Sequence, residues 1–224
     1  MRSISYHPSG DYLLAGTDHE IIRLYDLQSS TCYIPGASSD NHRGPINKVA
    51  FDTSGLLYTS CSRDGSIKLW DAVTNQCIMT IAAAHSGSEV FSVALSRSSR
   101  YILSRGKDDA VKLWDCGNGK LVRRYDGAHS QVRAPAVFSN AEDYILAGDD
   151  ATSAISIWDT RASAQLGRCQ GHDRPVKAIA ACPTRNVFAS GRCALQLYMR
   201  RQTNRPFVAW TTLCVSGPLQ AYRR

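Results

Sequence analysis

A chain of 224 residues with 43% hydrophobic and 20% charged residues is long enough to bury a substantial core and has the composition of a soluble globular protein. No apolar run approaches the roughly 20 residues that cross a bilayer, and the opening MRSISYHPSG lacks the apolar core of a secretory signal, so we expect an intracellular protein. The formal net charge of +7 suggests a nucleic-acid partner, but residues 199–224 hold five arginines and no acid. The excess is therefore more typical of a solvated basic tail than of an RNA groove.

Eight cysteines are spread through the chain, and none forms a Cys-x-x-Cys pair of the kind that binds zinc or exchanges disulfides. Their even number would also allow a disulfide framework, but such frameworks are typical of secreted proteins. We therefore expect unpaired thiols, no metal site and no cofactor. The cysteines are Cys32, Cys61, Cys77, Cys116, Cys169, Cys182, Cys193 and Cys214.

The predicted elements, taken in chain order, form a repeated unit that ends its third strand in Tyr-Asp or Trp-Asp. This marker closes the segments IIRLYD, SIKLWD, AVKLWD and SAISIWD. The four segments end at Asp26, Asp71, Asp115 and Asp159. A second marker keeps almost the same step of 44 residues, at His42, His85, His129 and His172. Two independent markers therefore set one register, which indicates a repeat architecture.

Within a unit, apolar residues alternate or form short runs instead of recurring at helical spacing. In the second unit this pattern predicts four strands, separated by turn-forming DTSG, SRDG and AVTNQ, at residues 49–51, 56–60, 66–71 and 77–81. Four strands per unit are typical of a propeller blade, whose apolar face is buried only against another blade. We predict an all-β chain with five units, near residues 4–34, 42–81, 85–125, 129–168 and 172–198, and a divergent basic tail over 199–224.

The repeated pattern of Gly-His or Ala-His and Trp-Asp resembles the WD40 repeat family. This resemblance implies a β-propeller of about five four-stranded blades, which forms an incomplete or open ring because the family's arrays are usually longer. It also implies a hydrogen-bonded chain in each blade of a His, a Ser or Thr, an Asp and the Trp. The residues that match are His42, Ser60, Asp64 and Trp70 in one unit, His85, Ser104, Asp108 and Trp114 in the next, and His129 and Trp158 in the fourth.

Ser, His and Asp are also the components of a hydrolase triad. The set recurs with the blade, however, and each set includes a Trp, whereas a triad is needed once. No Gly-x-Ser-x-Gly elbow, phosphate-binding glycine loop or His-Glu-x-x-His motif is visible in the sequence. We therefore interpret these residues as structural and predict no catalytic residue and no enzyme activity.

Longer stretches, above all SRYILSRGKDDAVKLWD, resemble the WD-repeat subunits of cleavage stimulation factor, which act in 3′-end formation of messenger RNA. The resemblance implies a nuclear, non-catalytic scaffold that docks on the helical-repeat scaffold subunit of that factor and on other 3′-end processing proteins. RNA would be contacted indirectly, through another subunit, and neither a membrane nor a small-molecule substrate is implied. The likeness stops after Arg201.

The partner surface can be placed only on the rim formed by the loops that lead into the blades and the turns between second and third strands. Four cations lie there beside pattern residues, Arg43, Arg63, Lys107 and Arg174. They could meet an acidic protein segment or RNA phosphate, or be ordinary solvated charge. Two alternative functions stay open: a substrate receptor of a cullin-type ubiquitin ligase, suggested by the WDTR segment ending at Arg161, and a WD40 scaffold of some other complex.

Overall fold

The computed structural model describes residues 1–185, 187–191, 197–201 and 211–215, and it is built almost wholly from antiparallel strands. Within these ranges the one helical element is a 3₁₀ turn, η1 (Ser38–Asp40). No helix in the same ranges has both the length and the apolar character needed to span a bilayer.

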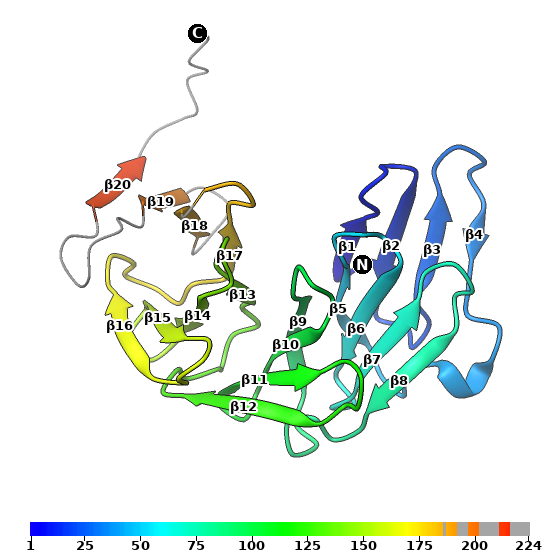
Figure 1. Ribbon diagram of the computed structural model, residues 1–224, viewed down its shortest axis with the longest axis horizontal. Coiled ribbons are helices and arrows are strands. Elements are labelled where there is room, and N and C mark those ends of the chain that lie inside the picture. Colours follow the sequence, from blue (N-terminus) through cyan, green and yellow to red (C-terminus); the bar gives the residue numbers. More distant parts are fainter. Residues whose placement is uncertain (186, 192–196, 202–210, 216–224) are drawn as a thin grey trace, which may run out of the picture.

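The strands form five four-stranded sheets, each made from consecutive segments of the chain (Figure 1). The first sheet contains β1 (Ser3–Tyr6), β2 (Tyr12–Gly16), β3 (Arg23–Asp26) and β4 (Cys32–Tyr33). The second contains β5 (Ile46–Phe51), β6 (Leu57–Ser62), β7 (Ile67–Asp71) and β8 (Cys77–Ile81). The third contains β9 (Val90–Leu95), β10 (Tyr101–Gly106), β11 (Ala110–Asp115) and β12 (Leu121–Asp126).

The fourth and fifth sheets repeat the same topology. The fourth contains β13 (Ala136–Phe138), β14 (Tyr144–Asp149), β15 (Ala154–Asp159) and β16 (Gln165–Cys169). The fifth contains β17 (Ala178–Ala181), β18 (Val187–Gly191), β19 (Leu197–Arg201) and β20 (Thr211–Val215). Residues 202–210 and 216–224 of the predicted tail lie outside the described residues, and the division of the chain into five units and a tail stays a prediction.

Within a sheet, each strand pairs with the next one along the chain, and several of the connections are tight turns of polar residues. The turn between β6 and β7 uses Gly65 at φ +82°, a left-handed conformation that glycine adopts without a steric penalty. A Cβ on Gly65 would also come within 2.9 Å of the carbonyl oxygen of Gly87, in the loop that leads into the third sheet. Glycine at this position therefore allows two neighbouring sheets to approach closely at their loops.

The apolar core is divided among the interfaces between successive sheets. Leu14 and Leu24 of the first sheet pack with Val49, Tyr58 and Trp70 of the second, where the two aromatic rings stack at 5.6 Å. Three further clusters join the second sheet to the third, the third to the fourth and the fourth to the fifth. Because each sheet buries its face against its neighbour, no sheet is expected to be stable alone.

The five sheets follow one another around an arc (Figure 1). Strands β1, β5, β9, β13 and β17 lie on the inside of the arc, where successive inner strands contact one another. A gap separates the first sheet from the fifth in this view. The predicted all-β class, with four-stranded blades in an incomplete ring, is confirmed.

Candidate functional site

A buried hydrogen-bonded chain crosses the third sheet from its third strand to its leading loop. The indole Nε1 of Trp114 donates to Ser104 Oγ at 2.8 Å, and Ser104 Oγ lies 2.8 Å from Nε2 of His85. Nδ1 of His85 lies 2.5 Å from Oδ1 of Asp108. Because the ionised Asp108 carboxylate can only accept, His85 carries its proton on Nδ1 and donates it to Asp108. Nε2 of the neutral imidazole is then an acceptor, so Ser104 donates to it while accepting the indole N–H. The four side chains therefore have one consistent set of proton positions.

The second sheet contains a similar chain with one more residue in it. Trp70 Nε1 donates to Ser60 Oγ at 2.9 Å, and Ser60 lies 2.6 Å from His42 Nε2. Nδ1 of His42 then meets Ser66 Oγ at 2.8 Å, and Ser66 donates to Asp64 Oδ1 at 2.6 Å. The closest direct approach of His42 to Asp64 is longer, 3.6 Å. Ser66 therefore bridges the imidazole and the Asp64 carboxylate.

Burial lowers the pKa of His42 and of His85 below the usual value for histidine, although contacts with Asp64 and Asp108 act in the opposite direction. Both imidazoles are therefore neutral at pH 7, as the hydrogen-bonded chains require. Burial alone would raise the pKa of Asp108, but hydrogen bonds from His85 and Lys112 outweigh it and lower the pKa to about 2.

The chains do not present a nucleophile to solvent. Ser60 and Ser104 are both fully buried, and each already accepts the indole N–H of its own sheet. A hydrolase serine must be reached by its substrate and must lie beside donors for an oxyanion. This arrangement can therefore tie a loop to a sheet, and it is not suited to nucleophilic attack.

The fourth sheet departs from the predicted pattern, and the assignment of His129 and Trp158 to one network is corrected. The side chain of His129 is 60% exposed and lies 3.5 Å from Asp109, whereas Trp158 Nε1 donates to the backbone oxygen of Asp126. The register explains the difference. In the second and third sheets, the residue that pairs with the Trp on the neighbouring strand is followed two positions later by a serine, Ser60 or Ser104. In the fourth sheet, the residue two positions after the partner of Trp158 is Ala147, which has no hydroxyl.

Two carboxylates replace the missing link in the fourth sheet. Asp149 accepts from the backbone N–H of His129 at 3.2 Å, and Asp150 accepts from the backbone N–H groups of Gln131 and Val132 at 2.6 Å each. The leading loop is thus held by its backbone and not by its imidazole. In the fifth sheet, His172 Nε2 lies 2.8 Å from Ser190 Oγ, which repeats the link between the histidine and the serine.

A fully buried arginine forms the joint between the third and fourth sheets, and the sequence reasoning did not identify it. Arg105 of β10 donates to Ser130 Oγ at 2.8 Å, to the His129 oxygen at 3.0 Å and to the Gly148 oxygen at 2.6 Å. Its guanidinium also lies 4.0 Å from Asp150. The sequence did contain a signal for this residue. Arg105 is a charged residue in a strand, YILSRG, whose other residues are apolar or small.

The four cations predicted as a partner surface are all exposed: Arg43, Arg63, Lys107 and Arg174. None of them takes part in an ion pair with another described residue. Arg43 and Arg63 flank the same carboxylate, since the Arg43 N–H donates to Asp64 and Arg63 precedes Asp64 in the chain. Arg161, which follows β15, is also exposed. Accessibility is thus satisfied for these residues, and their role in binding stays a prediction.

The cysteines whose side chains the structure describes show no arrangement that would hold a metal or a disulfide. Six of them, Cys32, Cys61, Cys77, Cys116, Cys169 and Cys182, are unpaired thiols. Cys193 lies outside the described residues, and for Cys214 in β20 only the backbone is described. Burial raises the pKa of the Cys61 thiol and raises the pKa of Cys116 to about 12. In the described part of the chain, no group of three His, Cys, Asp or Glu side chains could bind a metal ion.

Comparison with known proteins finds a known repeat in part of the chain. The family model described as WD domain, G-beta repeat, matches residues 1–26, 35–71 and 75–115. The chain is 43% identical over 104 residues to cleavage stimulation factor subunit 50 of Arabidopsis thaliana, covering 46% of this chain and 24% of that protein. It is 28% identical over 100 residues to pre-mRNA-processing factor 19 of Oryza sativa, a match that covers 45% of this chain and 18% of that protein. It is 36% identical over 69 residues to COMPASS component SWD1 of Saccharomyces cerevisiae, covering 30% and 16%. The chain therefore spans a quarter or less of the length of these relatives.

Proposed function

We propose, for a chain that carries WD40 repeats, that it is a non-catalytic scaffold in the cleavage and polyadenylation of messenger RNA 3′ ends. The observation that carries this proposal is the 43% identity over 104 residues to cleavage stimulation factor subunit 50. The other two relatives named above are less similar, at 28% and 36% identity over no more than 100 residues. The protein would act in the nucleus, dock on the helical-repeat scaffold subunit of cleavage stimulation factor and other processing proteins, and meet RNA through another subunit.

The stretch that most resembles this family has a structural role. Ser104, Asp108 and Trp114 belong to the buried chain of the third sheet, and Arg105 joins that sheet to the fourth. This similarity therefore supports a common blade-to-blade joint and does not itself identify a partner. The surface that would bind a partner must be sought among exposed residues.

The exposed cations of the rim are the candidates for docking. Arg43 and Arg63 lie at one leading loop and its adjacent turn, and Lys107 lies at the corresponding turn of the next sheet. An acidic segment of a partner protein would be complementary to this row of charges. Charged groups at the rim of an interface mainly set the rate of association and its dependence on salt.

Affinity purification of the full chain from nuclear extract, followed by mass spectrometry, tests the proposal. We expect cleavage and polyadenylation factors to be enriched, and the Arg63→Glu/Lys107→Glu variant to recover less of them. A version ending at Arg201 measures the contribution of the remaining residues. Recovery of processing factors no better than that of an unrelated propeller would contradict the proposal. Recovery of a ligase adaptor that is lost in Arg161→Ala would favour the ubiquitin-ligase alternative.

A further inference from the structure

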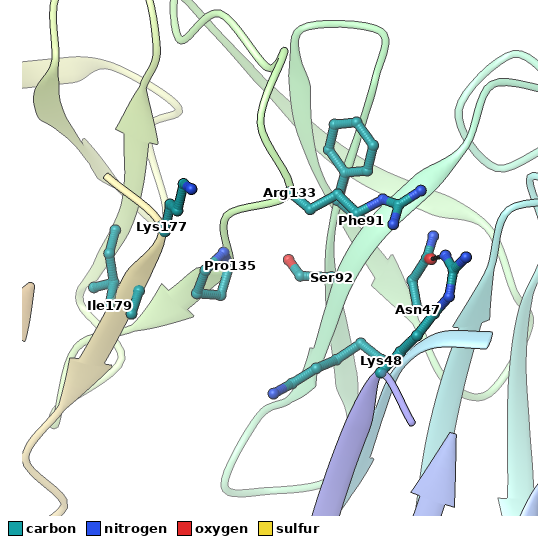
Figure 2. A pocket seen from close by; sticks show the side chains of 10 residues that line it. Asn47, Lys48, Phe91, Ser92, Arg133, Pro135, Lys177 and Ile179 are labelled. Atoms are coloured by element: carbon teal, nitrogen blue, oxygen red, sulfur yellow. Dashed lines mark hydrogen bonds between the residues drawn. The ribbon is translucent and has the colours of Figure 1, made fainter. Parts of the chain in front are cut away.

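A pocket of about 430 Å³ lies at the inside of the arc, between strands of different sheets (Figure 2). Its walls come from the starts of the inner strands and the residues just before them, so the pocket lies close to the leading loops. Four cations line it, Arg2, Lys48, Arg133 and Lys177, each from a different sheet or its leading segment, and no acidic residue does. Its size is that of a small-molecule site.

The four cations differ in how far their charge is already matched. Arg2 donates to Asp18 at 2.5 Å and to Asn47 at 2.7 Å, and Arg133 pairs with Glu89 at 2.7 Å. Lys48 and Lys177 take part in no ion pair with another residue that the structure describes. The pocket therefore keeps two uncompensated positive charges beside two charges that are partly compensated.

The two lysines lie on opposite walls of the pocket. Figure 2 shows the Lys48 side chain extended across the pocket toward the strand that carries Ile179, with Lys177 on the opposite wall. Like charges that share a pocket repel each other, and an anion placed between them would remove this repulsion. Ser92 and Pro135 lie between the two lysines in the same view.

Four of the inner strands, β1, β5, β9 and β13, are already hydrogen-bonded to one another across the sheets, which leaves less of their edges for an added strand. Ser3 and Ser5 of β1 accept from the backbone N–H groups of Val49 and Phe51, and Ser92 of β9 accepts from the N–H of Ala136. Asn47 donates to the carbonyl oxygen of Val90 at 2.7 Å. The four cations are the charged side chains of the lining, and they offer the strongest donors to a ligand there.

We propose that this pocket binds a compact ligand with clustered phosphate groups. Lys48 and Lys177 would hold it, together with the guanidinium N–H groups of Arg2 and Arg133 that are not already paired. Phosphate fits because each group presents several acceptor oxygens and more charge than a carboxylate, and both Lys and Arg bind it. The phosphates can belong to a free inositol polyphosphate or to a phosphorylated peptide segment. This inference does not depend on the scaffold role, since it rests on the pocket alone.

Calorimetric titration of the full chain tests the proposal, with inositol hexakisphosphate and a doubly phosphorylated serine peptide as the two probes. We expect at least one probe to bind, and the one that binds more tightly identifies the source of the phosphates. The Lys48→Gln/Lys177→Gln variant should bind at least about tenfold more weakly, because hydrogen bonds between charged groups are the strong ones. The control Lys120→Gln/Arg185→Gln, with the same loss of charge at exposed positions outside the pocket, should bind as the unaltered chain does.

Three results would overturn the proposal. Neither probe binds at low salt, or the pocket variant and the control variant lose affinity equally, or single-stranded RNA competes at the same sites with higher affinity. The third result would mean that the pocket is part of an RNA-binding groove. Circular dichroism of both variants shows whether they are folded, and thermal stabilisation of the unaltered chain by each probe is a second measurement that needs no substitution.

Discussion

Replacing Ser104 with alanine is the sharpest test of the buried chains, because one hydroxyl there serves two partners. The hydroxyl accepts the N–H of Trp114 and donates to Nε2 of His85, both at 2.8 Å. The alanine variant leaves both groups buried without that partner. An unsatisfied buried donor or acceptor costs about 1–3 kcal/mol. We therefore expect the free energy of unfolding to fall by about 2–4 kcal/mol in Ser104→Ala.

Urea denaturation followed by tryptophan fluorescence measures the loss, with Ser98→Ala as the control. Ser98 is exposed in the turn before β10, so its alanine variant should lose less than about 0.5 kcal/mol. Hydrogen exchange adds the location. In Ser104→Ala the amides around His85 should exchange faster, while those of the first sheet should not change.

A double-mutant cycle with Trp114→Phe separates the hydrogen bond from the change in volume. Phe has no N–H, so in the Trp114→Phe background the Ser104→Ala substitution leaves only His85 without a partner. The loss of unfolding free energy in the double variant should therefore be smaller than the sum of the two single losses by about 1 kcal/mol. A loss in Ser104→Ala that matches the control, or strict additivity in the cycle, would show that the chain contributes nothing to stability.

Three further predictions address the remaining contacts. His85→Ala should lower the free energy of unfolding by at least about 2 kcal/mol, whereas His129→Ala should change it by less than about 0.5 kcal/mol, as measured by urea denaturation; equal losses would refute the difference between the third and fourth sheets. Arg105→Met should cost about 3 kcal/mol and speed hydrogen exchange near His129, because several carbonyl oxygens lose their donor; protection that is unchanged would contradict this. Because the folded pKa of His42 and of His85 lies below the unfolded value of about 6.5, acidification protonates the unfolded chain first. The free energy of unfolding should therefore fall as the pH drops from 7.5 to 5.5, and a His42→Asn/His85→Asn variant should show a weaker dependence.

The repeat and its strands could be predicted because they depend on local patterns. Tight turns and alternating apolar residues lie within a few positions of each other, and the Trp-Asp marker fixes the register of each unit. The strands predicted at residues 66–71 and 77–81 differ from the observed β7 and β8 by one residue at most.

The exceptions depend on contacts between sheets, for which the sequence carries no periodic marker. The fourth sheet contains His129 and Trp158 at the expected spacing, but counting back ten residues from the Trp gives Gly148. The observed register aligns Ala147 instead, because the turn before β15 is one residue longer. Arg105 was missed for a similar reason, since its partners lie 24 to 43 residues further along the chain.

The buried chains and the exposed rim are connected, because the loops and turns that the chains hold also fix the backbone of rim residues. Asp64 ends the chain that begins at Trp70, and it also accepts from the backbone N–H of Arg43 at 2.6 Å. The backbone of Lys107 is fixed by a hydrogen bond to the oxygen of Glu89, in the loop that His85 ties to its sheet. These anchors act on backbone atoms and leave the side chains of the rim residues unconstrained. The repeat can therefore present different side chains on loops of constant geometry, which is the property that a scaffold needs and a catalyst with one fixed reactive group does not.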